Sequence, residues 1–254
     1  MMDNAGYAID ISGFHKRYGR QWAVRGLDLR VRRGTFFGFV GPNGAGKSTT
    51  INAMVGLIQP SSGTIRVAGY DIATQPLEVK ARVGFMPEEP ALYQRLTGRE
   101  YLDFVGRMYG LKAEAVKERR DWLLKLLDLD GSKFIGTYSH GMRKKVSMAA
   151  SLIHRPPVVI LDEPFSGIDP TSASRVRGVL NEMVGDGHTV FFSSHVLETV
   201  ERISGEIGVI HQGRLLASGT LREVLSQAGC AETASLEDAY LNLVEGREVL
   251  GPCE

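Results

Sequence analysis

The chain has 254 residues, of which 43% are hydrophobic and 23% are charged, and its formal net charge is +1. This composition is ordinary for a globular protein with an apolar core, and no block of lysine and arginine is long enough to suggest a nucleic-acid-binding surface. No stretch approaches the roughly 20 apolar residues of a membrane-spanning helix, so we expect any role at a membrane to depend on a partner.

The first residues, MMDNAGYAID, lack the charged start and apolar core of a secretory signal peptide, which favours a cytosolic location. Over residues 7–40 the pattern predicts strands and turns, with the alternation of half-buried antiparallel strands. The alternating apolar positions are Ile9, Ile11, Leu27, Leu29 and Val31. Residues 35–40, TFFGFV, are apolar nearly throughout, which predicts a central strand that is buried on both faces.

Further strands are predicted at residues 64–67, 82–86, 158–162, 189–193 and 207–211. Between about residues 98 and 153 the period changes, and apolar residues such as Leu102, Val105 and Met108 recur at helical spacing. We therefore expect an α/β core that is interrupted by an all-helical insertion over about residues 96–155.

The strongest local motif is GPNGAGKS at residues 41–48, a full match to G-x-x-x-x-G-K-[ST] between a predicted strand and a helix-like segment. Its glycines permit a close approach of the backbone, so that N–H groups and the positive end of the following helix can surround a phosphate. Lys47 supplies a positive charge, and the hydroxyl of Ser48 suits Mg²⁺. The predicted nucleotide-binding residues of this loop are Gly41, Pro42, Asn43, Gly44, Ala45, Gly46, Lys47, Ser48 and Thr49. A glycine-rich turn without a ligand is the alternative.

A second half of the site is predicted at residues 158–164, VVILDEP. Four apolar residues form a buried strand, and Asp162 follows at its carboxyl end, the edge at which such sheets bind ligands. Asp162 can hold Mg²⁺, and Glu163 is placed to polarise the water that attacks a γ-phosphate. Two carboxylates in a solvated turn would be the alternative if the phosphate loop were absent.

Four more segments complete an ordered set: KRYG around Tyr18, YSHGM at residues 138–142, SGIDP around Asp169, and TVFFSSH ending at His195. In order and spacing, and over nearly the whole chain, the set resembles the nucleotide-binding subunit of an ABC transporter. The resemblance implies that Tyr18 stacks on adenine and that His195 bonds the γ-phosphate. It also implies that Asp169 lies in a loop that couples two such subunits.

Residues 138–142 resemble the family signature that is usually written LSGGQ, with Ser139 and Gly141 retained and with His140 and Met142 as departures. Ser139 suits a helix N-cap, and the positive end of that helix would point at a phosphate. A plain N-cap without a ligand is the alternative. The resemblance further implies catalytic roles for Lys47, Glu163 and His195.

At the position where the family usually has a glutamine that senses Mg²⁺, this sequence has Glu88. A carboxylate can still bind the metal, but it cannot donate a hydrogen bond at neutral pH. The predicted metal ligands are therefore Ser48, Glu88 and Asp162. Any role that needs an amide N–H is in doubt at this position.

Residues 87–97 and the tail at residues 235–244 resemble the ABC-2 group, whose members are mostly exporters with short membrane subunits. The two cysteines, Cys230 and Cys253, are interpreted as reduced thiols. We expect a nucleotide-binding domain over residues 1–228 and a short helical tail over residues 229–254.

The sequence thus predicts an α/β P-loop NTPase core with a mostly parallel sheet, an N-terminal antiparallel β subdomain and an inserted helical subdomain. The resemblance implies an ATPase that uses ATP and Mg²⁺, drives a separately encoded membrane permease and lies against the inner face of the cell membrane. Two copies would close head-to-tail on two ATP molecules, and the loop at residues 87–97 would pass the movement on.

Two rival functions remain, a small-molecule kinase with a phosphate loop and a relative that acts on DNA or ribosomes. The kinase explains neither the signature-like motif nor His195. The DNA-repair type needs a long coiled coil, and the translation type needs two such domains with a charged linker. Neither feature is present in this sequence, and we expect no nucleic-acid partner.

Overall fold

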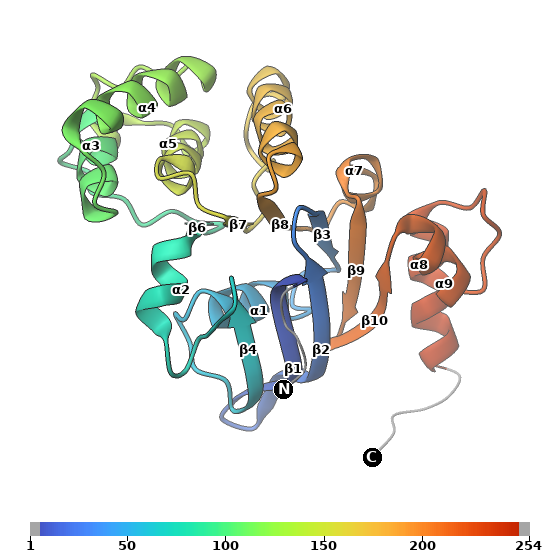
Figure 1. The fold of residues 1–254 in the computed structure, drawn as a ribbon. Helices are drawn as coiled ribbons and strands as arrows, with labels where there is room; N and C mark the ends of the chain where they lie inside the picture. The colour runs from blue at the N-terminus through green and yellow to red at the C-terminus, as the bar shows by residue number, and fades with distance from the viewer. Residues whose placement is uncertain (1–5, 249–254) are drawn as a thin grey trace.

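The computed structural model describes residues 6–248, which form two β-sheets with helices around them (Figure 1). The first sheet is antiparallel and has the strand order β2-β1-β4-β5. Its strands are β1 (Tyr7–Tyr18), β2 (Gln21–Arg32), β4 (Ser62–Val67) and β5 (Tyr70–Asp71). Ile9 and Leu27 are fully buried, which confirms the alternation that the sequence predicts here.

The second sheet has the order β10-β9-β3-β8-β7-β6, and it is parallel except for β10. Its strands are β3 (Phe36–Val40), β6 (Val83–Met86), β7 (Val158–Leu161), β8 (Thr189–Ser194), β9 (Glu206–His211) and β10 (Arg214–Gly219). Strand β3 lies between β8 and β9 and is buried throughout. Phe37 and Phe39 face one apolar cluster, which they share with the antiparallel sheet, whereas Phe36 and Val40 face the other.

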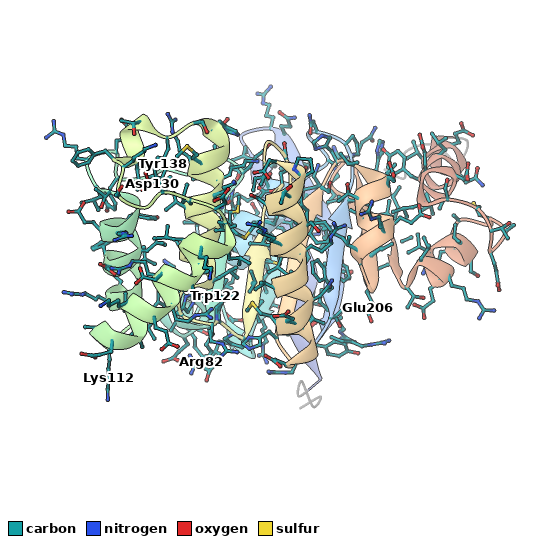
Figure 2. The ribbon with its side chains drawn as sticks, turned by 90° about the horizontal axis from the view of Figure 1, so that it is seen from above. Arg82, Lys112, Trp122, Asp130, Tyr138 and Glu206 are labelled. Atoms are coloured by element: carbon teal, nitrogen blue, oxygen red, sulfur yellow. The ribbon has the colours of Figure 1, made fainter. Side chains whose placement is uncertain are left out.

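Three helices and a short 3₁₀ turn lie between β6 and β7 in the chain and gather on one side of the molecule (Figure 1). They are α3 (Gly98–Met108), α4 (Ala113–Leu126), η1 (Ile135–Thr137) and α5 (His140–Leu152). Helix α3 begins at a capping box in which Thr97 and Glu100 bond each other's backbone N–H groups. The buried Tyr138 donates its hydroxyl hydrogen to the carbonyl of Asp130 at 2.8 Å, which fixes the segment before α5 (Figure 2).

The remaining helices are α1 (Lys47–Met54), α2 (Pro76–Arg82), α6 (Pro170–Gly185), α7 (Leu197–Ile203), α8 (Leu221–Gln227) and α9 (Leu236–Glu248). Helix α1 follows β3 directly after the phosphate loop. Helices α8 and α9 lie on the side of the molecule away from α3–α5 (Figure 1). No helix among residues 6–248 is long and apolar enough to cross a membrane.

The predicted fold class is confirmed, although the strand bounds predicted from the sequence differ from the observed ones by one or two residues and six elements of the described chain were missed. Arg82 is the last residue of α2 rather than the first of a strand, because it pairs with Glu78 one turn earlier and its guanidinium covers the ring of Tyr70. The missed elements are strands β5 and β10 and helices α2, α6, α7 and α8. Cys230 is a free thiol, whereas Cys253 lies outside the described residues.

Candidate nucleotide site

The phosphate loop connects the buried strand β3 to α1 and presents backbone N–H groups at the helix start. Gly46 has a φ of 106° and precedes α1. A Cβ at Gly46 would lie 2.8 Å from the carbonyl oxygen of Ala23, so only glycine fits this turn. In residues 6–248 no acceptor is found for the N–H groups of Gly44, Gly46 and residues 47–49. They are free to bind an anion.

The other predicted loop residues differ in exposure. Gly41 and Ala45 are buried, Ser48 and Thr49 are partly exposed, and the exposed group is Pro42, Asn43 and Gly44. The exposed tip is where a ligand can approach, whereas the buried residues anchor the loop to the core.

Lys47 is the first residue of α1, and its side chain is only 6% exposed. Its Nζ donates to the carbonyls of Gly41 at 2.7 Å and Pro42 at 3.2 Å, and it lies 3.8 Å from Oε1 of Glu163. Burial lowers the pKa of Lys47, and the charges of Glu163, Asp162 and Glu88 oppose that shift. The ammonium is therefore held among carboxylates beside the loop.

Asp162 and Glu163 follow β7 and are 4% and 5% exposed. Ser193, at the end of the neighbouring strand β8, donates its hydroxyl hydrogen to Oδ1 of Asp162. The same Oγ accepts a hydrogen bond of 3.0 Å from the N–H of Glu163. Because β7 and β8 are parallel neighbours, their carboxyl ends meet at one edge of the sheet and Ser193 fixes both acidic residues there.

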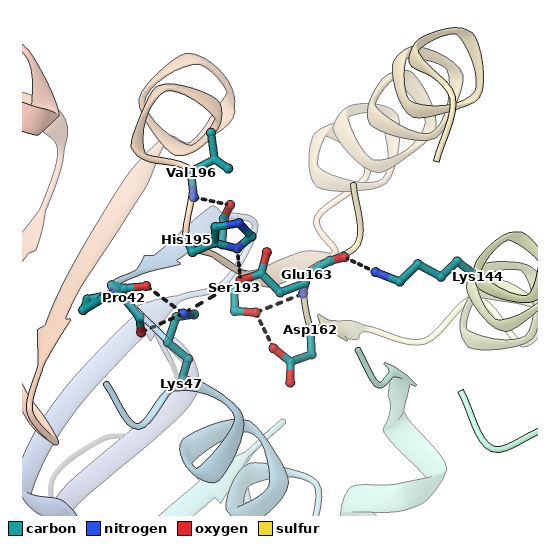
Figure 3. A network of polar contacts seen from close by, with 10 residues as sticks. Pro42, Lys47, Lys144, Asp162, Glu163, Ser193, His195 and Val196 are labelled. Atoms are coloured by element: carbon teal, nitrogen blue, oxygen red, sulfur yellow. Dashed lines mark hydrogen bonds and ion pairs between the residues drawn. The ribbon is translucent and has the colours of Figure 1, made fainter. Parts of the chain in front are cut away.

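The Glu163 carboxylate lies between two positive or protonatable groups (Figure 3). Its Oε1 is 3.0 Å from Nδ1 of His195, and the same oxygen faces Lys47. His195 directly follows β8, and its side chain is 46% exposed. A cleft of about 140 Å³ opens beside this pair, lined by Glu163, Phe165, Ser193, Ser194, His195 and Val196. A carboxylate and an imidazole on one small cleft can orient a water molecule.

Three oxygen-bearing side chains were predicted to bind Mg²⁺, and they offer the hard donors that this ion prefers. Ser48 directly follows Lys47, while Asp162 and Glu88 are both near enough to act on its charge. Within residues 6–248 no three acidic, histidine or cysteine side chains could hold a metal together. Oxygen donors of this kind fit a Mg²⁺ ion that takes its other ligands from nucleotide phosphates and water.

Tyr18 ends β1, is 51% exposed, and carries the Nζ of Lys16 at 5.0 Å from its ring centroid. It pairs across the hairpin with Gln21, close in the chain to Ala23, whose carbonyl touches Gly46. The hairpin thus brings an exposed aromatic ring to the neighbourhood of the phosphate loop.

The signature-like segment lies at the start of α5. Ser139 is exposed and caps the helix, accepting a 3.3 Å hydrogen bond from the N–H of Met142. A Cβ at Gly141 would lie 2.8 Å from the carbonyl oxygen of Gly167, and the ring of His140 is also close to Gly167. No hydrogen bond or ion pair in the described chain joins Ser139 to residues 41–49.

Asp169 caps α6 by accepting from the N–H of Ser172 at 2.8 Å. Nζ of Lys145 on α5 is 2.8 Å from its Oδ2. The hydrogen bond from Lys145 is the largest cause that lowers the pKa of Asp169 below its usual range. The loop after Glu163 is therefore tied to the signature helix.

Sequence reasoning assigned no role to Ser193 or Lys144. The buried side chain of Lys144 on α5 donates to the carbonyl of Glu163 at 3.1 Å (Figure 3). This hydrogen bond and the one between Glu163 and Ser193 both join residues that are far apart in the chain. The position of Ser193 just before the predicted histidine was the only signal in the sequence.

A phosphate loop after a buried parallel strand, faced by an acidic strand end and a histidine, places the chain among the P-loop ATPases. Comparison with known proteins narrows this class. The family model "ABC transporter" matches residues 24–166. The daunorubicin resistance ATP-binding protein DrrA3 of Streptomyces coeruleorubidus is 40% identical over 224 residues, which cover 87% of this chain and 71% of that protein.

The linearmycin resistance ATP-binding protein LnrL of Bacillus subtilis is 39% identical over 223 residues, covering 87% of this chain and 72% of that protein. A solved structure of an ATP-binding subunit of an ABC transporter superposes with a TM-score of 0.88 at 33% identity, and the match covers 93% of this chain and 99% of that one. A dimeric post-hydrolysis cassette with ADP and Pi has a TM-score of 0.78 at 21% identity, covers 84% of this chain and 99% of that chain, and supports the fold alone. The chain belongs to the ABC transporter ATP-binding family and is an ATP-hydrolysing subunit.

Proposed function

We propose that this chain drives an ABC-2 type exporter, hydrolysing Mg·ATP while bound to a separately encoded permease at the inner face of the cell membrane. The observation that carries the catalytic part is the Glu163 carboxylate, buried at the end of β7 with His195 at 3.0 Å. The names of the relatives that confer daunorubicin and linearmycin resistance support the export part.

In this proposal the free N–H groups of Gly44, Gly46 and residues 47–49 and the ammonium of Lys47 bind the phosphates. Lys47 exchanges its bonds to the carbonyls of Gly41 and Pro42 for phosphate oxygens. Tyr18 stacks on the adenine. These groups position the nucleotide and neutralise its charge, which is most of what phosphoryl transfer requires of a protein.

Glu163 orients the attacking water and accepts its proton, and His195 bonds the γ-phosphate while steadying the carboxylate. Ser48, Asp162 and Glu88 would hold Mg²⁺, which would supply positive charge beside the nucleotide phosphates. Ser193 keeps Asp162 and Glu163 in place through its two hydrogen bonds.

The second subunit supplies Ser139 in trans. Because Ser139 is exposed at a helix N-terminus and has no bond to residues 41–49 of its own described chain, it is available to a nucleotide on another copy. Two copies arranged head-to-tail would each complete the other's site, with Asp169 in the coupling loop between them.

The permease docks near residues 87–97. Tyr93 is 60% exposed and Phe104 of α3 is 41% exposed, with ring centroids 5.7 Å apart. An exposed aromatic cluster of this kind is typical of a protein interface. It lies close in the chain to Glu88, so nucleotide state and docking can affect each other.

The catalytic part is tested with Glu163→Gln, which keeps the shape of the side chain and removes its basicity. We expect kcat to fall about 10²–10⁴-fold, as for the loss of a positioned general base, with ATP affinity retained. Phosphate release and ATP titration measure the two quantities. A variant with more than half of wild-type turnover would exclude Glu163 from the mechanism.

The transport part is tested by expressing the chain with the membrane proteins encoded beside it and purifying from detergent-solubilised membranes. We expect co-purification with a permease, and weaker recovery for Tyr93→Ser combined with Phe104→Ser. A chain that transfers phosphate from ATP to an added small molecule, and recovers no membrane protein, would instead be a kinase.

A further inference from the structure

Lys144 is a buried lysine on α5 for which the mechanism above has no role. Its side chain is 2% exposed, and its Nζ donates to the main-chain carbonyl of Glu163 at 3.1 Å. Burying an ammonium is costly unless it is paired. Burial lowers the pKa of Lys144, and the negative charges of Glu88, Glu163 and Asp162 oppose the shift. The buried ammonium of Lys144 is thus hydrogen-bonded to a main-chain carbonyl next to the reaction centre.

The main chain of Glu163 is in an unusual conformation. Its φ is 49°, in the left-handed region that residues other than glycine seldom adopt. Such a conformation is strained and persists only where the surroundings impose it. Two contacts do so here, because the N–H of Glu163 donates to Ser193 and its carbonyl accepts from Lys144.

We propose that Lys144 is a positioning residue, whose hydrogen bond to the Glu163 carbonyl holds this left-handed turn and thereby aims the carboxylate at the attacking water. Ser193 fixes one side of the residue from β8, and Lys144 fixes the other from α5. With the main chain of Glu163 fixed on both sides, its carboxylate oxygen Oε1 lies 3.0 Å from Nδ1 of His195.

The position of Lys144 on α5 gives the contact a further consequence. The same helix carries Ser139 at its N-cap and Lys144 five residues later, so a movement of α5 also moves the donor that holds Glu163. This step rests on the proposed function, in which Ser139 contacts the nucleotide of a partner. Engagement of one site would then adjust the catalytic carboxylate of the other.

The test is Lys144→Met, which keeps the apolar stem and removes the ammonium. Replacing a buried charge by an apolar group of similar shape is often neutral for folding, so the variant should fold. We expect kcat to fall about 10–100-fold, since misplacing a catalytic group by about 1 Å can cost 10²-fold. The Kd for ATP should stay within about twofold, because the phosphate loop is untouched.

Three companions make the result specific. Lys144→Arg keeps a charged donor and should retain more activity than Lys144→Met. The exposed Lys125 on α4 provides a matched control, because Lys125→Met should leave kcat unchanged. In single-turnover assays Lys144→Met should add little to the defect of Glu163→Gln, because residues that act as a unit are non-additive.

Full activity in Lys144→Met overturns the inference, as does a kcat loss that multiplies with that of Glu163→Gln. A parallel loss of ATP affinity and melting temperature in Lys144→Met also overturns it, since this would indicate a structural role. Failure of the proposed function looks different, because Glu163→Gln alone would then keep its turnover.

Discussion

At the scale of single residues, the buried cation of Lys47 lies among several carboxylates. Lys47 is held near Glu163, Asp162 and Glu88, and burial lowers its pKa while these charges oppose the shift. When an anionic nucleotide arrives, the cation can turn from backbone carbonyls to phosphate oxygens. The site is therefore arranged for a ligand that brings negative charge with it.

Tyr18 can be tested as the adenine contact. Tyr18→Ala should raise the Kd for ATP about 5–150-fold, since base–aromatic stacking contributes roughly 1–3 kcal/mol, and it should change kcat little. The side chain is half exposed, so folding should be unaffected. Tyr18→Phe serves as the control and should bind ATP as the wild type does. Equal affinity in Tyr18→Ala and the wild type, measured by calorimetry, would place the adenine elsewhere.

At the scale of elements, the ends of α3 and α5 are joined by a ring stack. The rings of Tyr109 and His154 are 3.5 Å apart and nearly parallel, and the Tyr109 hydroxyl donates to the carbonyl of Val83 at 3.4 Å. The stack thus ties the helices of the insertion to the first residue of β6. Burial lowers the pKa of His154 from 6.5 to about 4.

This pKa shift predicts a pH dependence of folding. Between pH 6.5 and pH 4, His154 is protonated in the unfolded chain but neutral in the folded chain. The stability that neutral His154 contributes is therefore fully present above this window and is lost as the pH falls through it. From pH 7 to pH 5 we expect His154 to account for a loss of about 1–2 kcal/mol, after allowing for its partial exposure. His154→Phe keeps a ring for the stack and should remove the pH-dependent loss of stability that is due to His154. Urea unfolding at both pH values gives the comparison, and an identical loss in wild type and variant would contradict it.

Strands with a strong pattern could be predicted from the sequence, whereas short or edge strands and the 16-residue helix α6 were missed. Strand β3 was identifiable because both of its faces are apolar, and it is buried on both. Strand β5 has two residues, too few to show any period. Strand β10 pairs only with β9, at the edge of its sheet, and Arg82 was misassigned because pairing with Glu78 extends α2 to that position.

The candidate site divides in the same way. Residues in contiguous motifs, such as Lys47 and Glu163, were identifiable from local spacing, and the structure places them 3.8 Å apart. The hydrogen bonds of Ser193 and Lys144 to Glu163 depend on how β7, β8 and α5 meet. No local pattern encodes that meeting, so only the folded chain reveals it.

At the scale of the whole molecule, the proposal requires two copies, because one chain offers a phosphate loop and a signature helix that do not bond each other. A mixture of Ser139→Ala and Lys47→Ala chains tests this. Each mixed pair would contain one composite site with both groups intact and one that lacks both. If one intact site can turn over alone, mixing should raise the ATPase rate above the mean of the two separate variants.

If both sites must act together, the mixture stays inactive. Cross-linking then tests whether Ser139 lies at the phosphate loop of the partner chain. Cys230 and Cys253 are first replaced by serine, and cysteines are then introduced as Asn43→Cys, at an exposed position of the phosphate loop, and Ser139→Cys. Glu163→Gln is added so that ATP is retained. We expect ATP-dependent disulfides between two chains, visible as a doubled mass on non-reducing gels, and a matched Lys125→Cys with Asn43→Cys pair should not link. Links that form only within one chain would exclude the trans arrangement, because they would place Ser139 against its own phosphate loop.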